Sequence, residues 1–198
     1  TVNRYYSSLS KMLKYAFNRP NEYGLKSVPH IEWEKENNER VRFVDLKEEK
    51  LMQKIMLERN QKDYLDYYLF LMDTGLRKTE ALKLKKSDVQ TDVVSKTQYV
   101  IVQESKNNEK RSVPLCKRAS EIVSRLIEHK EEDDCIFQLN TWTVQHKWTD
   151  LRELMGLEDD REFTLHALRH TYASRLAQSG KVDFHKIGVL MGHKSLQM

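Results

Sequence analysis

The sequence predicts a mainly α-helical, α+β fold: a helical domain that contains one small antiparallel sheet of three strands. Apolar residues recur at helical spacing over most of the chain. Residues 62–73 are apolar on almost every side after their first turn, which is typical of a helix buried in a core. The strand-like stretches fall within residues 88–115. With 198 residues, the chain can bury one good core and a small appendage.

The N-terminal part is predicted to be separate from the main domain. Residues 1–19 have the apolar spacing of a helix, which we interpret as the last helix of an upstream domain. Residues 20–44 contain proline, glycine and many charged side chains without a clear period, so they are predicted to be a linker. Residues 45–198 are regular and form the predicted principal domain. Asp45 can cap its first helix, which should continue to about Glu58.

The same signals predict the remaining elements. Thr74-Gly75 should end the buried helix, and a short helix should follow over residues 78–85. Three strands are expected near residues 88–89, over 98–103 and over 111–115, with a turn at Asn107-Asn108 between the last two. Four further helices are predicted over residues 117–130, over 141–155, from Leu165 after a Thr164 cap, and over 184–191.

Composition indicates a soluble intracellular protein. Charged residues make up 32% of the chain and the mean hydropathy is −0.74. No apolar run of about 18 residues is present, so the sequence predicts no membrane span, and its start has no leader pattern. Cys116 and Cys135 lack ligand-like neighbours in sequence and are interpreted as reduced thiols. The net charge of +4 is compatible with a nucleic-acid partner.

Two polar residues near the start of the helix at Leu165 point to phosphate chemistry. His166 and Arg169 are three residues apart, so they should lie side by side, next to the apolar stripe that contains Leu168 and Tyr172. A guanidinium beside an imidazole suits a phosphate whose oxygens gain charge during a reaction. An ordinary surface helix with polar residues explains this stretch equally well by itself.

Other polar residues stand at positions that a scaffold would hold. Arg77 lies where the buried helix ends and the next helix begins, and Glu80 can pair with a neighbouring cation. Lys106 is at the tip of the basic hairpin. His193 directly follows a helix that ends at Gly192. Each position also has a plain interpretation: a structural ion pair, a solvated hairpin tip or a helix cap.

Together, these residues resemble the catalytic set of the tyrosine recombinases, the phage and transposon integrase family. Four local motifs carry the resemblance: Thr-Gly-Leu-Arg-x-x-Glu at 74–80, the basic hairpin leading into Val113-Pro114-Leu115, His-x-Leu-Arg-His-Thr at 166–171, and Leu-Met-Gly-His-Lys-Ser at 190–195. Arg-Val-Arg-Phe-Val at 40–44 is similar to the segment with which the family's catalytic domain begins.

The resemblance implies site-specific DNA recombination, such as integration or excision of a phage or mobile element, through a 3′-phosphotyrosyl intermediate. Arg77 and Arg169 would clamp the scissile phosphate and stabilise its pentavalent transition state, and Glu80 would support the arginine network. In family terms, residues 1–19 resemble the last helix of a truncated core-binding domain. Residues 45–198 resemble the catalytic domain without its C-terminal tail.

The resemblance also assigns the proton transfers. His166 would assist proton removal from the nucleophile, Lys106 would donate a proton to the leaving 5′ oxygen, and His193 would hydrogen-bond the phosphate. The family's tyrosine nucleophile lies a short distance beyond the position of His193, and no tyrosine follows His193 in this sequence. The chain is therefore expected to lack its nucleophile, and as given to bind DNA without cleaving it. No metal ion or cofactor is implied.

The implied partners are double-stranded DNA at attachment or recombination sites and other recombinase protomers, in a tetramer on DNA. Accessory DNA-bending or excision factors are further expected partners, a membrane is not, and the expected location is the bacterial cytoplasm, associated with the nucleoid. The candidate contacts to the DNA backbone are basic residues: Lys83, Lys85, Lys86, Lys110, Arg111 and Lys147.

Four alternatives remain open from the sequence. A catalytically inactive, DNA-binding regulatory relative would keep the fold and lose the reaction. A type IB topoisomerase shares the chemistry, although the motifs and the small size favour an integrase. His166 and His170 are spaced like zinc ligands on a helix, but Ala167 stands where zinc hydrolases have glutamate. A phosphohydrolase with a histidine nucleophile would need a βαβ order, for which the predicted β content is too small.

Overall fold

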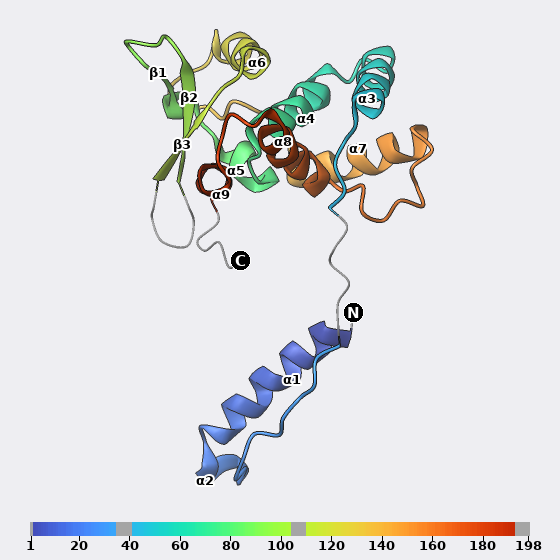
Figure 1. Ribbon diagram of the computed structural model, residues 1–198, viewed down its shortest axis with the longest axis vertical. Helices are drawn as coiled ribbons and strands as arrows, with labels where there is room; N and C mark the ends of the chain where they lie inside the picture. The colour runs from blue at the N-terminus through green and yellow to red at the C-terminus, as the bar shows by residue number, and fades with distance from the viewer. Residues whose placement is uncertain (1, 35–40, 104–109, 193–198) are drawn as a thin grey trace. The chain divides into compact units, whose positions relative to one another are not determined.

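The structure of the protein is a computed structural model that describes residues 2–34, 41–103 and 110–192 (Figure 1). The chain divides into two compact units, Thr1–Arg40 and Val41–Met198. The predicted boundary between linker and main domain at residue 45 therefore lies four residues later than the boundary between the two units.

The first unit contains two helices followed by an extended segment. α1 spans Val2–Phe17, and α2 is a single turn over Pro20–Tyr23. Proline at the first position of α2 and a left-handed Gly24 after its last residue explain why this turn forms inside the predicted linker. The side-chain amide of Asn3 donates to the carbonyl oxygen of Glu34 over 2.8 Å, and the Glu34 N–H donates back to Asn3 Oδ1 over 3.0 Å.

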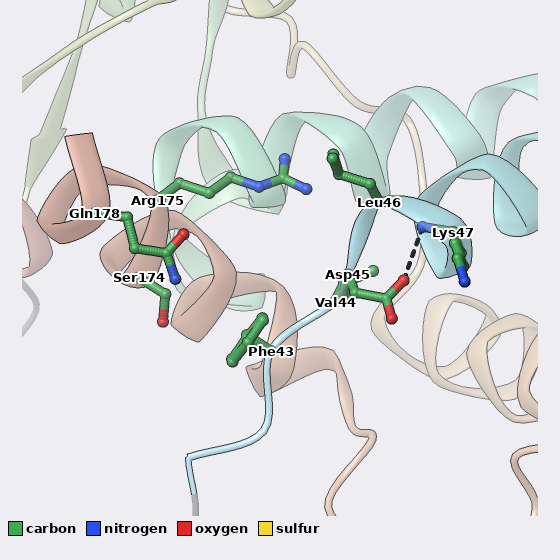
Figure 2. Close-up of a pocket in the computed structure, with 8 residues that line it drawn as sticks. All are labelled: Phe43, Val44, Asp45, Leu46, Lys47, Ser174, Arg175 and Gln178. Carbon is green, nitrogen blue, oxygen red and sulfur yellow. Dashed lines mark hydrogen bonds between the residues drawn. The ribbon is translucent and has the colours of Figure 1, made fainter.

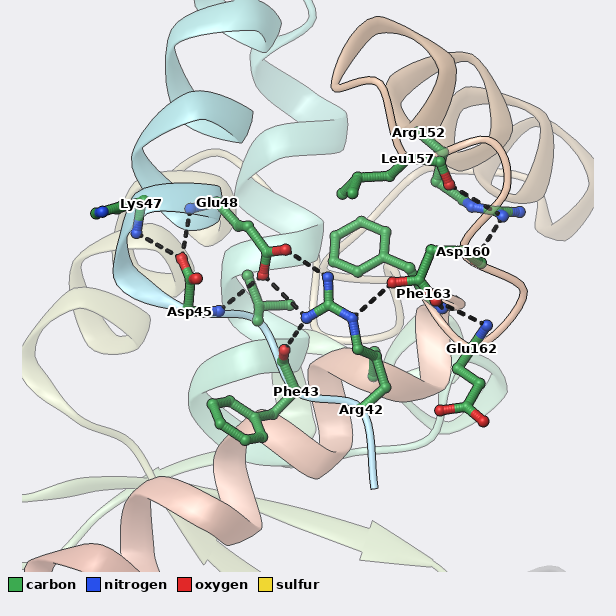
Figure 3. Close-up of polar contacts among 12 residues, drawn as sticks. Arg42, Phe43, Asp45, Lys47, Glu48, Arg152, Leu157, Asp160, Glu162 and Phe163 are labelled. Atoms are coloured by element: carbon green, nitrogen blue, oxygen red, sulfur yellow. Dashed lines mark hydrogen bonds and ion pairs between the residues drawn. The ribbon is translucent and has the colours of Figure 1, made fainter. Parts of the chain in front are cut away.

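The second unit begins with a segment that ion pairs hold in place (Figure 3). Arg42 donates from Nε to Asp160 over 2.8 Å and from Nη1 to Glu48 over 3.0 Å. The hydrogen bond from Arg42 lowers the pKa of Asp160 below its usual value. Glu48 also accepts the backbone N–H of Asp45 and completes the capping box that starts the next helix. These contacts explain why residues 41–44 belong to this unit and not to a linker.

The second unit is mainly helical with one small sheet, as predicted. Its helices are α3 (Leu46–Glu58), α4 (Lys62–Thr74), α5 (Lys78–Lys83), α6 (Lys117–Ile127), α7 (Thr141–Leu154), α8 (Leu165–Ser179) and α9 (Phe184–Met191). The predicted caps Asp45 and Thr164 are confirmed, because the side chain of each accepts backbone N–H groups of the following turn. α4 lies at the centre of this unit and packs against α3, α6 and α8 (Figure 1).

The sheet contains the strands β1 (Val89–Thr91), β2 (Gln98–Gln103) and β3 (Lys110–Pro114), antiparallel and in that order. A short 3₁₀ turn, Lys86–Asp88, precedes β1. In the register of β2 and β3, Val100 is opposite Val113 and Val102 is opposite Arg111. Residues two apart on a strand share a face, and all four of these side chains lie on the buried face of the sheet. The sheet thus turns one arginine toward the helices.

The core is built around the middle of α4. Tyr67, Tyr68 and Phe70 are fully buried there. The two hydroxyl groups are hydrogen-bonded: Tyr67 donates to the carbonyl of Lys78 over 2.7 Å, and Tyr68 donates to the carbonyl of Val144 over 2.9 Å. Burial raises the pKa of both phenols, so they stay neutral. These bonds connect α4 to the start of α5 and to α7.

Candidate active site

Three arginine side chains converge on the C-terminal end of α9. Arg111 Nε donates to the carbonyl oxygen of Leu190 over 3.1 Å, Arg169 Nη2 donates to that of Met191, and Arg77 Nη2 donates to that of Gly192 over 3.4 Å. The last carbonyl groups of a helix have no partner within the helix, and they form the negative end of its dipole. We call these three side chains the arginine cluster. Its members come from α8, from β3 and from the junction between α4 and α5.

Glu80 is a carboxylate at the edge of this cluster. Its Oε1 accepts from Arg77 Nη1 and its Oε2 accepts from Arg111 Nη2, each over 2.7 Å. The backbone N–H of Arg77 donates to Oε2 as well, over 2.9 Å. Burial by itself would raise the pKa of Glu80, but the hydrogen bonds from Arg111 and Arg77 outweigh burial and hold the pKa below its usual value. Glu80 is therefore ionised at neutral pH and orients two guanidinium groups.

Arg169 is buried, which differs from the sequence interpretation. The helical spacing placed it beside His166 on one polar face, whereas in the structure Arg169 is 3% exposed and His166 is exposed. Arg169 Nη1 donates to the carbonyl oxygen of Gly75 over 2.6 Å. Gly75 has φ +64, and a Cβ atom there would lie 2.4 Å from the Tyr172 ring. A glycine at this turn thus lets the end of α4 approach α8 closely enough for Arg169 to hold it.

His166 and His170 lie next to each other on the first turns of α8. Their ring centroids are 4.6 Å apart, in an edge-to-face arrangement. Burial, followed by the charge of Arg169, lowers the pKa of His170. Among the residues that the structure describes, no group of three or more His, Cys, Asp or Glu side chains is placed to hold a metal ion.

Residues 36–198 match the sequence model of the phage integrase family. This chain belongs to the phage integrase family. The match confirms the resemblance found in the motifs. In the residues that the structure describes, the sheet has three antiparallel strands and lacks the βαβ order that a histidine phosphohydrolase would need.

Relatives and solved structures of the family agree with this assignment. The tyrosine recombinase XerC of Rhizobium meliloti is 33% identical over 136 residues, which cover 64% of this chain and 40% of the relative. The Tn1549 transposon integrase, solved with circular intermediate DNA, has a TM-score of 0.70 at 15% identity and covers 96% of this chain and 71% of its own. A lambda integrase tetramer on a Holliday junction has a TM-score of 0.65 at 20% identity, over 96% of this chain and 57% of its own. These two structures show the fold.

The chain spans less than half the length of the curated relatives it matches. The matched part covers 33%, 40% and 46% of three of them. The family assignment therefore applies to residues 36–198 of this chain.

The structure separates the predicted catalytic residues of this integrase family member into two sets. Arg77 and Glu80 are joined by a hydrogen bond, and Arg169 donates to the carbonyl of Gly75, two residues before Arg77. His166 lies on the same helix as Arg169. Lys106 and His193 lie outside the residues that the structure describes.

The residues predicted to contact the DNA backbone have different surroundings. Lys85 pairs with Asp133 over 2.8 Å. Lys86 donates to the carbonyl of Lys130 over 2.6 Å, and Lys147 pairs with Asp150 over 3.5 Å. Lys83 and Lys110 are exposed.

Arg111 departs from its predicted place as an exposed contact, because it lies on the inward face of β3 and is buried. Its position in the arginine cluster was missed from the sequence. The signal was present, since Arg111 is two residues before the apolar Val113 and must share its face.

A groove in the second unit lies apart from the arginine cluster. A groove of about 740 Å³ is lined by residues 43–47 and by Ser174, Arg175 and Gln178 of α8 (Figure 2). No described member of the predicted site lines this groove.

No helix in residues 2–34, 41–103 and 110–192 is long and apolar enough to cross a membrane.

Proposed function

We propose that this protein is a site-specific DNA recombinase that cleaves and rejoins DNA strands through a 3′-phosphotyrosyl intermediate. The observation that carries the proposal is the arginine cluster. Arg77 and Arg169 come from opposite halves of the chain and donate to the carbonyl groups of adjacent residues, Gly192 and Met191. A scissile phosphate that enters the cluster offers these guanidinium groups stronger, charged acceptors.

The proposed chemistry assigns a role to each predicted residue. Arg77 and Arg169 stabilise the charge that develops on the phosphate oxygens, and Glu80 orients Arg77. His166 assists proton removal from the attacking tyrosine, and Lys106 protonates the leaving 5′ oxygen. His193 hydrogen-bonds the phosphate.

The tyrosine remains bonded to the 3′ phosphate until the 5′ hydroxyl of a strand attacks and releases it. Energy of the phosphodiester bond is thereby retained for rejoining, without a metal ion or cofactor.

Domains, partners and location follow from this proposal. We assign Thr1–Arg40 to the end of a core-binding domain and the unit that begins at Val41 to the catalytic domain. The partners are double-stranded DNA at recombination sites, further protomers in a tetramer and accessory DNA-bending or excision factors. The location is the bacterial cytoplasm, with the nucleoid.

The test uses the full-length gene product on a nicked suicide duplex that carries the recombination site of its element. We expect a covalent protein–DNA band on a denaturing gel, weakened about 10²–10³-fold in Arg169→Ala because one transition-state donor is lost. Arg59→Ala, at an exposed arginine that follows α3, is the matched control and should leave the band unchanged.

Two other outcomes decide against the proposal. Binding to a verified site without a covalent band supports the inactive DNA-binding relative. Relaxation of supercoiled DNA without recombination supports a topoisomerase.

A further inference from the structure

The most deeply placed polar group on the sheet is the guanidinium of Arg111. Its residue is 9% exposed, and it is opposite Val102 in the register of β2 and β3. A charged side chain on the buried face of a strand is costly unless ion pairs and hydrogen bonds compensate for the lost hydration. The contacts of Arg111 therefore indicate why an arginine stands there.

Arg111 connects three segments of the candidate active site. From β3 it reaches Glu80 of α5, with Nη2 over 2.7 Å from Oε2, and it reaches the carbonyl of Leu190 in the last turn of α9 over 3.1 Å. Glu80 is the same carboxylate that holds Arg77. In the sequence, Lys106 is four residues before the start of β3, and His193 is two residues after the end of α9.

The two arginines on Glu80 differ in exposure. The Arg77 side chain is 45% exposed, whereas that of Arg111 is 8% exposed. Arg77 is thus the partner that can turn toward a phosphate on the surface, while Arg111 stays on Glu80. With Arg111 in place, Glu80 keeps a fixed position and ionisation state whichever acceptor Arg77 uses.

We propose that Arg111 is a positioning residue for strand cleavage, which acts through Glu80 on Arg77 and fixes the carbonyl end of α9, without itself touching DNA. This proposal rests on the proposed recombinase function for its kinetic consequence. Its structural consequence, the hold of Arg111 on Glu80, is independent of that function.

The first experiment measures this hold in the 198-residue chain without DNA. The carboxyl carbon of Glu80 is titrated by NMR in the wild type, in Arg111→Met and in Arg125→Met. Arg125 is the matched control, because it pairs with the buried Asp66 over 2.8 Å on another part of the domain. We expect the pKa of Glu80 to rise in Arg111→Met and to stay unchanged in Arg125→Met. An unchanged pKa of Glu80 in Arg111→Met overturns the proposal, whatever the activity of the protein.

The second experiment measures single-turnover cleavage of the suicide duplex by the full-length gene product at saturating protein. We expect Arg111→Met to slow cleavage on the order of 100-fold, the scale of a misplaced catalytic group. Arg111→Lys should restore part of the rate, because an ammonium keeps the charge but is a compact point charge without the planar fork of donors that a guanidinium presents. Ser112→Ala, on the exposed face of β3, should retain the wild-type rate.

A double-mutant cycle and a salt series separate positioning from the other roles of an arginine. If Arg111 acts in part through Glu80, Arg111→Met should slow cleavage less in a Glu80→Gln background than in the wild type, and the remaining effect comes from its contact with Leu190. Full additivity of the two changes contradicts the proposal. A salt dependence of DNA affinity that becomes shallower by about 0.9 in the log–log slope marks Arg111 as a phosphate contact and also overturns it. Absence of a covalent band in the wild type, with the NMR result as expected, counts against the recombinase function alone.

Discussion

Two networks of arginine and carboxylate side chains in the second unit differ in the acceptors that their guanidinium groups use. In the first, Glu49 of α3 accepts from Arg118 and Arg175, and Arg118 also donates to both oxygens of Asp73 over 2.6 Å. Two guanidinium groups thus meet two carboxylates, and the network joins α3, α4, α6 and α8. In the arginine cluster, Arg77 and Arg111 donate to the carboxylate of Glu80. All three guanidinium groups of the cluster also donate to backbone carbonyl groups at the end of α9.

The difference between the networks shows which of them is suited to an anion. Balanced charges satisfy one another, so the Glu49 network has no requirement for a ligand and serves to hold helices together. The guanidinium groups of the arginine cluster donate to backbone carbonyl groups, and a charged phosphate is a stronger acceptor for them. The use of backbone carbonyl groups as acceptors at the end of α9 therefore distinguishes the candidate active site from the Glu49 network, where the guanidinium groups pair with carboxylates.

The largest loss of stability is expected from a substitution in the Glu49 network. Glu49→Gln leaves Arg118 and Arg175 without their shared carboxylate, which should cost roughly 3 kcal/mol of unfolding free energy, as for a broken buried ion pair. Urea unfolding of the 198-residue chain measures this cost. Glu80→Gln is the counterpart in the arginine cluster and should cost less, since carbonyl acceptors remain there. Equal losses of unfolding free energy in the two variants would contradict this difference between the Glu49 network and the arginine cluster.

Acid should remove part of the stabilisation that the ionised Glu49 carboxylate provides. Burial alone would raise the pKa of Glu49, but the hydrogen bonds from Arg118 and Arg175 lower it on balance. Because the folded-state pKa is the lower one, this stabilisation is complete above the unfolded value of about 4.3 and is lost as pH falls through the folded pKa. Unfolding free energies measured from pH 6 downward should fall more steeply in the wild type than in Glu49→Gln. Parallel curves would contradict the assigned shift.

The turn between α4 and α5 is the next most sensitive place. Gly75→Ala puts a methyl group 2.4 Å from Tyr172 at a φ of +64, and should cost about 2 kcal/mol or more. Gly156→Ala is the matched control, because its φ of +69 is similar but no atom lies within 4 Å of the added carbon. It should cost only about 1 kcal/mol, the strain of the left-handed backbone. Denaturant unfolding of both variants isolates the contact with Tyr172.

Inorganic phosphate tests whether the arginine cluster binds an anion. At a free concentration ten times its dissociation constant, it should stabilise the wild type by about 1.4 kcal/mol through binding to the arginine cluster. The stabilisation should disappear in Arg77→Met. It should persist in Arg118→Met, because Arg118 belongs to the Glu49 network. Thermal unfolding with increasing phosphate at constant ionic strength provides the measurement. Equal responses of the two variants would indicate a general salt effect.

The smallest effect is expected at an exposed cation. Lys83→Ala should leave the thermal midpoint unchanged, because the side chain lies on the surface at the end of α5. If Lys83 contacts a DNA phosphate, the log–log salt slope of DNA affinity should become shallower by about 0.9. Filter binding at several salt concentrations measures the slope. An unchanged slope removes Lys83 from the proposed DNA contacts.

The order and approximate bounds of the elements were predictable from the sequence, because they depend on local rules. The strand at 98–103 and the helix at 184–191 have the bounds that periodicity predicted, and Asp45 and Thr164 cap the helices expected to follow them. The second unit begins at Val41, before the predicted boundary at residue 45, and one partner of Arg42, Asp160, is distant in sequence.

The tertiary structure alone decided how the candidate site is arranged. The motifs identified Arg77, Glu80 and Arg169 one at a time, since each stands in a short recognisable stretch of sequence. The burial of Arg169 and the meeting of three guanidinium groups at the end of α9 were not predictable from those stretches. They depend on strand register and on helix packing between segments far apart in the chain, which local spacing does not specify.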